Sequence, residues 1–116
     1  MKILIVDDDL HIQRLYKEEF EDEGYEVVVA SNGQEAIEMF EKESPDIVTL
    51  DILLPDIDGI RVLRQMKEKN PKIPVIMSTA YDYRDDFAVW ASEAYIVKSS
   101  DLDELKIMIK KLLTKQ

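Results

Sequence analysis

The chain has 116 residues, no cysteine and a formal net charge of −10, from 25 acidic and 15 basic residues. This length allows one domain with a real core, and the lack of cysteine excludes disulfides and thiolate metal sites. The excess of carboxylates argues against direct binding of nucleic acid, because lysine and arginine are the residues that neutralise phosphates. No apolar run reaches the ~20 residues of a membrane span and no signal-peptide pattern opens the chain, so we expect a cytoplasmic protein without membrane insertion.

Five short apolar runs alternate along the chain with amphipathic segments. Their length and their β-branched residues predict strands at 2–6, 26–30, 46–50, 74–78 and 94–97. The segments that follow the strands have helical periodicity, and turn-forming residues separate the elements. This alternation predicts an α/β fold, with a doubly wound, five-stranded parallel sheet and helices on both of its faces.

Two helices carry signals for where they start and which side they bury. Asp9 precedes the first helix and Asp101 precedes the last one, so we expect both aspartates to act as N-caps. In the first helix, the spacing of Leu15, Tyr16 and Phe20 predicts that these three side chains share the face turned toward the core.

Polar residues follow the predicted strands at the edge where open α/β sheets bind their ligands. Asp7 and Asp8 follow the first strand, Asp51 the third, Thr79 the fourth and Lys98 the fifth. Carboxylates drawn together from two strands repel one another and form an oxygen-rich pocket. Such a pocket suits a hard divalent cation such as Mg²⁺, which would also neutralise the crowded aspartates.

Phosphoryl transfer to a carboxylate is the chemistry that fits this set of groups. An aspartate can form a covalent acyl phosphate, while a metal ion and a lysine neutralise the charge of the transferred group. Asp51 is the best candidate for the nucleophile, because it ends the central strand. The segment after it, "ILLPDIDG", contains Pro55 and Gly59, which favour a tight loop before the third helix.

Four segments together resemble the motifs of a known family. "ILIVDDD", "DIVTLDILLPDIDG", "VIMSTA" and "YIVKS" are similar, in order and spacing, to the response-regulator receiver domain of two-component signalling. The resemblance covers essentially all 116 residues and is strongest to stand-alone receivers of the chemotaxis and sporulation-phosphorelay types. It implies a single receiver domain over residues 1–116 without an output domain. It also implies a flavodoxin-like three-layer sandwich with strand order 2-1-3-4-5.

The resemblance also implies the roles of the acidic residues. Asp51 would be the phosphoacceptor, phosphorylated by a sensor histidine kinase or a histidine phosphotransferase. Mg²⁺ would be bound by Asp8, by Asp51 and by the backbone carbonyl of Leu53, with Asp7 acting through water. The protein would then be a regulatory phosphoacceptor rather than an enzyme.

Three further residues take their expected roles from the same resemblance. Lys98 would contact the phosphoryl group, Thr79 would move toward it, and Tyr95 would change rotamer with it. These movements would alter the face made by the helix expected between the fourth and fifth strands, the fifth strand and the last helix. A downstream protein would read that face, unless the signal passes by onward phosphotransfer in a phosphorelay.

The sequence departs from the family pattern in three places. Ser99 replaces the usual proline after Lys98, and a cis bond before a non-proline residue costs about 2.5–4 kcal/mol. The interval from Thr79 to Lys98 is about three residues shorter than is usual in the family. Leu53 has an apolar side chain where many members of the family have a polar one. Hydrolysis of the acyl phosphate needs a water molecule placed in line, and neither Leu53 nor the bulky Tyr81 can orient that water as an acid or amide would. We therefore expect slow self-dephosphorylation, which suits a relay intermediate.

Two functions of other classes compete with this interpretation. A haloacid-dehalogenase-like phosphatase also places a nucleophile after its first strand, and Asp7 and Asp9 satisfy its D-x-D pattern. That class needs a longer chain with a cap domain and gives Asp51 no role. A flavodoxin-like nucleotide binder would need a loop of backbone N–H donors around phosphate, whereas "DDDLH" repels phosphate unless a metal bridges the two.

Overall fold

The predicted arrangement of strands and helices is present in the structure. The computed structural model describes residues 1–79, 94–97 and 102–114. The elements in chain order are β1 (Lys2–Val6), α1 (Leu10–Asp22), β2 (Glu26–Ala30), α2 (Gly33–Glu43), β3 (Ile47–Leu50), α3 (Gly59–Lys69), β4 (Val75–Thr79), β5 (Ala94–Val97) and α4 (Asp103–Thr114). The five strands form one parallel sheet in the order β2-β1-β3-β4-β5, which confirms the predicted fold class and strand order.

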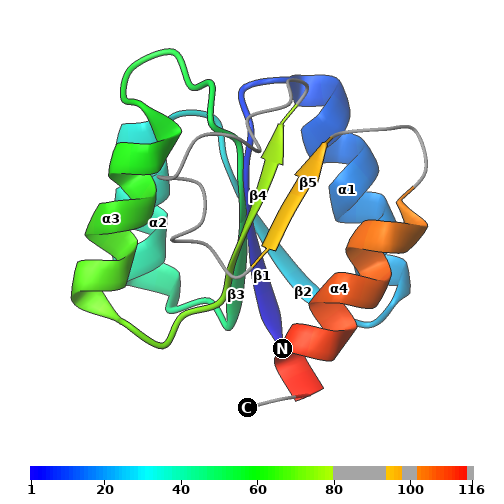
Figure 1. Cartoon of the computed structure of the whole chain (residues 1–116). Helices are drawn as coiled ribbons and strands as arrows, with labels where there is room; N and C mark the ends of the chain where they lie inside the picture. The colour runs from blue at the N-terminus through cyan, green and yellow to red at the C-terminus, as the bar shows by residue number, and fades with distance from the viewer. Residues whose placement is uncertain (80–93, 98–101, 115–116) are drawn as a thin grey trace.

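α2 and α3 cover one face of this sheet and α1 and α4 cover the other (Figure 1). An apolar core lies on each of the two faces. Leu4 and Val6 of β1 point toward α2 and α3, and Ile3 and Ile5 point toward α1 and α4. A strand that is buried on both faces needs apolar residues at successive positions, because side chains alternate between the faces. This requirement explains the near-continuous apolar runs of the sequence and leaves the ends of the strands as the places where polar groups gather.

Several element boundaries differ by a residue or two from those predicted. β1, β2 and β5 match, while β3 begins at Ile47 and β4 runs to Thr79, one residue later than expected. The last helix begins at Asp103, so Leu102 directly precedes it, and the predicted cap Asp101 lies outside the described residues. Within the part of the chain that the structure describes, no helix has both the length and the apolar character needed to cross a membrane.

The buried face of α1 is narrower than the sequence predicted. Tyr16 and Phe20 are buried, with ring centroids 6.0 Å apart in an edge-to-face contact. Leu15 is 38% exposed, so its assignment to the buried face was wrong. With about 3.6 residues per turn, Ile12, Tyr16 and Phe20 form one stripe, and Leu15 falls at its edge.

Candidate functional site

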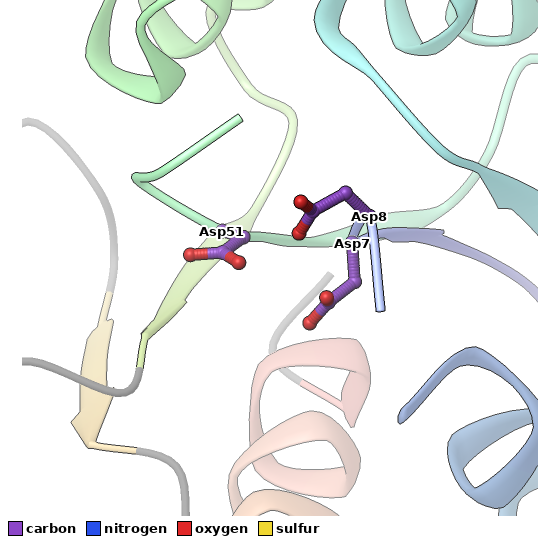
Figure 2. Close-up of side chains that lie close together, drawn as sticks. All are labelled: Asp7, Asp8 and Asp51. Carbon is purple, nitrogen blue, oxygen red and sulfur yellow. The ribbon is translucent and has the colours of Figure 1, made fainter. Parts of the chain in front are cut away.

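Three carboxylates meet at the carboxyl end of the sheet, as the sequence predicted. Asp7 and Asp8 follow β1, and Asp51 follows β3; these strands are neighbours whose last paired residues are Val6 and Leu50. One oxygen from each of the three carboxylates lies within 4.8 Å of the others. Figure 2 shows the three side chains gathered at the ends of the two strands. Asp7 is 2% and Asp51 6% exposed, whereas Asp8 is open to solvent.

Backbone hydrogen bonds fix the cluster by extending the sheet beyond its strands. The N–H of Asp7 donates to the Ala30 carbonyl, and the N–H of Asp51 donates to the Val6 carbonyl, each at 3.1 Å. The side chains are oriented in turn, because Asp7 Oδ1 accepts from the Asp9 N–H at 2.9 Å and Asp51 Oδ1 accepts from the Leu53 N–H at 3.1 Å. Both buried carboxylates therefore have defined positions.

The third aspartate of the run has a separate, structural role. Asp9 Oδ1 accepts from the backbone N–H of His11 at 2.8 Å and of Ile12 at 3.4 Å, which confirms the predicted N-cap of α1. Satisfying these N–H groups stabilises the helix directly behind the acidic cluster.

The loop from Asp51 to α3 is compact because of one glycine. The Gly59 N–H donates to the Ile52 carbonyl at 2.9 Å, and a Cβ at Gly59 would lie only 2.2 Å from the backbone oxygen of Asp51. A residue with a side chain would thus force the loop open. Leu53, two residues after Asp51, is 46% exposed beside the cluster.

Sequence reasoning missed a contact that joins this loop to α2. The Asp56 carboxylate accepts from the N–H of Gly33 at 2.7 Å and of Gln34 at 3.0 Å. The hydrogen bonds from Gln34 and then Gly33 lower the pKa of Asp56, because they favour its charged form. The partners are more than twenty positions apart, so no local sequence pattern signals the contact.

The remaining predicted site residues lie at or beyond the edge of the described part. Thr79 is the last residue of β4, and its register partner on β5 is Val97, which directly precedes Lys98. The side chains of Thr79 and Tyr95, and all of Lys98 and Ser99, lie outside what the structure describes. The predicted roles of these residues stay predictions.

Ser78 is a buried polar residue next to this edge. Its side chain is 3% exposed, and its hydroxyl is the one buried side-chain polar atom within the described ranges that has no hydrogen-bond partner. Leaving such a hydroxyl unsatisfied costs about 1–3 kcal/mol. Leu50 pairs with Met77 in the β3–β4 register, so Ser78 is level with Asp51. The sequence showed Ser78 at the strand end but gave it no function.

The donor set of the cluster fits a hard divalent cation. The oxygens of the three carboxylates converge, and two of the three residues are buried. Such carboxylates repel one another unless positive charge is near. Mg²⁺ and similar ions prefer such oxygen ligands. Among the residues that the structure describes, Asp7, Asp8 and Asp51 could therefore hold a metal ion.

Known proteins match nearly the full length of this chain. A family model, the response regulator receiver domain, matches residues 3–110. Sporulation initiation phosphotransferase F of Bacillus subtilis is 40% identical in an alignment 115 residues long that covers 97% of this chain and 93% of the relative. Regulatory protein AtoC of Escherichia coli is 37% identical in an alignment 119 residues long that covers 99% of this chain but 26% of that protein. The chain thus spans about a quarter of the length of AtoC.

Solved structures agree with the sequence relatives. The response regulator protein TrrA of Thermotoga maritima, in complex with Mg²⁺-BeF, has a TM-score of 0.92 and 45% identity, with 96% of this chain and 97% of that chain covered. A complex of the histidine kinase ThkA with TrrA gives a TM-score of 0.91 at the same identity, with 97% of each chain covered. With this fold, this acidic cluster and a family match over most of its residues, the chain belongs to the family of response regulator receiver domains.

Proposed function

We propose that this chain accepts a phosphoryl group on Asp51 from a histidine kinase or a histidine phosphotransferase, in a reaction that depends on Mg²⁺. The observation that carries the proposal is the convergence of the Asp7, Asp8 and Asp51 carboxylates at the carboxyl end of the sheet. The kinase complex of TrrA and the similarity to a sporulation phosphotransferase support the kind of donor. In this proposal residues 1–116 act as one receiver domain, a regulatory phosphoacceptor rather than an enzyme.

The metal ligands in this proposal are Asp8, Asp51 and the backbone carbonyl of Leu53, with Asp7 acting through water. When bound, Mg²⁺ supplies positive charge against the carboxylates and the incoming phosphoryl oxygens. The N–H of Leu53, which donates to Asp51 Oδ1, limits the rotation of the nucleophile. The complex of TrrA with Mg²⁺-BeF supports the choice of metal.

In the transfer step, the P–N bond of a phosphohistidine breaks and a P–O bond to an Asp51 carboxylate oxygen forms. The product is an acyl phosphate, and the released imidazole nitrogen takes its proton from solvent. We propose that Lys98 contacts the transferred group and that Thr79 and Tyr95 change position with it. Asp51 contributes both the attacking oxygen and, through its burial, a site with little competing water.

The signal would then pass by protein contact or by onward phosphotransfer. For the contact, we propose the face that includes β5, the last helix and the helix expected between β4 and β5, which lies outside the described residues. Ile107 on α4 is 68% exposed and supports this choice, because a large apolar side chain in water favours a partner.

The phosphoacceptor is tested with Asp51→Asn. Asparagine keeps the shape of the side chain but is not a nucleophile, so we expect no labelling by acetyl phosphate or by a phosphorylated kinase. Asp9→Ala is the control, because Asp9 caps α1 and should be dispensable for labelling. Phosphopeptide mapping of the wild type should place the label on Asp51. Label on Asp7 would favour the phosphatase alternative, and stoichiometric labelling of Asp51→Asn would contradict the proposal.

The relay role is tested by the lifetime of the phosphoprotein. Leu53 is exposed beside Asp51 and neither donates nor accepts a hydrogen bond, so water near the acyl phosphate is poorly oriented. We expect Leu53→Asn to lose its phosphoryl group several-fold faster than the wild type in Mg²⁺, and Leu53→Asn with Tyr81→Glu to lose it faster still. Leu15→Asn, which changes an exposed leucine on α1, should decay like the wild type. Equal rates for all variants would remove the argument for slow hydrolysis.

A further inference from the structure

The corner where β2 leads into α2, residues 31–34, is joined through Gln13 to the loop that carries Asp7 and Asp8. Gln13, on α1, donates through Nε2 both to the backbone carbonyl of Asp7 and to Ser31 Oγ, the latter at 2.9 Å. One amide group thus joins the acidic loop after β1 to the first residue of the corner. The corner itself is ordered by a hydrogen bond of 3.3 Å from the Ser31 N–H to Glu35 Oε1.

The same corner is bonded to the loop that carries Asp51 and Leu53. Asp56, three residues after Leu53, accepts from the N–H groups of Gly33 and Gln34 through its two carboxylate oxygens, at 2.7 and 3.0 Å. Two charge-assisted hydrogen bonds to adjacent backbone groups fix both the position and the orientation of the loop.

The corner and this loop are also in direct contact. A Cβ at Gly33 would lie 2.9 Å from Ile57 Cβ and 3.1 Å from Val62 Cγ2, closer than ordinary packing allows. The absence of a side chain at position 33 is what permits the approach. The loop is therefore held against α2 by packing as well as by the hydrogen bonds of Asp56.

We propose that this corner sets the separation of the two loops that supply the metal ligands, with Gln13 and Asp56 as positioning residues. The inference rests on the proposed Mg²⁺ site of Asp8, Asp51 and the Leu53 carbonyl. The corner, with the sequence "SNGQ", supplies no carboxylate. Hydrogen bonds join it directly to the loop of Leu53 and, through Gln13, to the loop of Asp7. A displacement of the corner therefore changes the distance between ligands that follow different strands. Mutation of the partners that orient metal ligands typically lowers metal affinity by about 10- to 100-fold.

Calorimetric titration with Mg²⁺ tests this proposal on the full chain. We expect Asp56→Ala to weaken Mg²⁺ binding by about 10-fold. Asp56→Asn removes the same charge but keeps one acceptor oxygen, so its loss should be clearly smaller. Gln13→Leu leaves the charge unchanged and should also weaken binding. The double variant Gln13→Leu with Asp56→Ala should lose less than the product of the two single losses, because both act through one corner.

Asp46→Ala is the matched control. The Asp46 carboxylate accepts from the backbone N–H of Lys2 at 2.7 Å, at the opposite end of the sheet, so this variant removes the same charge and the same kind of bond. Its melting temperature in EDTA should fall, while its Mg²⁺ affinity stays within about twofold of the wild type.

Each other outcome counts against the proposal. Equal losses for Asp56→Ala and Asp56→Asn would assign the effect to charge alone. A loss no larger than that of Asp46→Ala would show that Asp56 only stabilises the fold. If Asp56→Ala does not fold in EDTA, Asp56→Asn and Gln13→Leu decide, and wild-type affinity in both overturns the proposal. A wild type that fails to bind Mg²⁺ would instead contradict the proposed function.

Discussion

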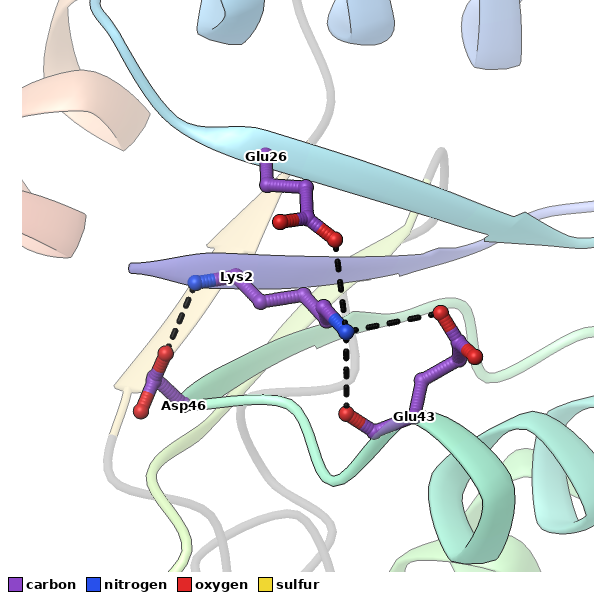
Figure 3. A network of polar contacts seen from close by, with 4 residues as sticks. All are labelled: Lys2, Glu26, Glu43 and Asp46. Carbon is purple, nitrogen blue, oxygen red and sulfur yellow. Dashed lines mark hydrogen bonds and ion pairs between the residues drawn. The ribbon is translucent and has the colours of Figure 1, made fainter.

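The two ends of β1 both gather carboxylates, but they arrange them differently. At the amino end, Lys2 Nζ lies 3.3 Å from Glu26 Oε2, 3.4 Å from Glu43 Oε1 and 3.2 Å from the Glu43 carbonyl (Figure 3). Asp46 accepts from the backbone N–H of the same lysine. The acidic residues come from three different elements or loops, and the Lys2 ammonium group stands between two of them, Glu26 and Glu43.

At the carboxyl end the carboxylate oxygens face one another. The oxygens of Asp7, Asp8 and Asp51 lie within 4.8 Å of each other, and two of the three residues are buried. At the amino end Glu26 is two-thirds exposed and Glu43 a quarter exposed, so water screens that network.

The amino-end cluster therefore has a structural role, and the carboxyl-end cluster is suited to a functional one. In the first cluster a side chain of the protein supplies the cation, and the result is a surface ion pair of modest energy. In the second, the backbone fixes acidic groups at a separation suited to a cation that binds from solution, as we propose for Mg²⁺. Removing an acidic group from the carboxyl end should therefore raise the melting temperature in the absence of Mg²⁺. Removing the lysine cation from the amino end should lower it.

The largest expected effect is that of Asp8→Ala. We expect this variant to lose the Mg²⁺-dependent rise in melting temperature, because it lacks a proposed ligand. In EDTA it should melt a few degrees above the wild type, because it relieves repulsion within the cluster. The measurement is thermal unfolding followed by circular dichroism, with and without Mg²⁺. Asp9→Ala should melt lower in both conditions and keep the Mg²⁺ shift; a persistent shift in Asp8→Ala would contradict the metal assignment.

A smaller effect of the opposite sign is expected for Lys2→Met. Loss of the ammonium leaves Glu26 and Glu43 without their shared partner, so the melting temperature should fall by a few degrees in EDTA. Calorimetry should give an unchanged Mg²⁺ affinity, because the network lies at the far end of the sheet. Lys2→Arg keeps the charge and should melt near the wild type. Weaker Mg²⁺ binding in Lys2→Met would show that the two ends are coupled.

The smallest effect concerns pH. Hydrogen bonding and charge attraction from Glu26, then Glu43, raise the pKa of Lys2 above its ordinary value of 10.5. A group whose pKa is raised in the folded state stabilises the protein fully below the unfolded pKa and loses that contribution as the pH rises through the folded pKa. The gap in melting temperature between the wild type and Lys2→Met should therefore be constant from pH 8 to about 10 and shrink above it. If the difference in melting temperature already shrinks below pH 9, the titration of Lys2 is not its cause.

Much of the fold and of the acidic cluster followed from the sequence, because the signals are local. The apolar runs fixed β1 and β2 to the residue, and the capping role of Asp9 needs only the backbone two and three positions away. The position of Asp7 and Asp51 directly after neighbouring parallel strands was enough to predict that they meet, because all strands of such a sheet end at one edge.

The tertiary structure decided what depends on partners distant in the sequence. Periodicity assigned Leu15 to the core, yet the width of the contact between α1 and the sheet leaves it exposed. Nothing near Asp56 or Gln13 in the sequence indicates that each binds the corner before α2, since the crossovers and the close approach at Gly33 determine which loops touch. Local hydrogen bonds and side-chain periodicity are determined by a few consecutive residues, whereas the distance between two loops depends on the packing of every element that connects them.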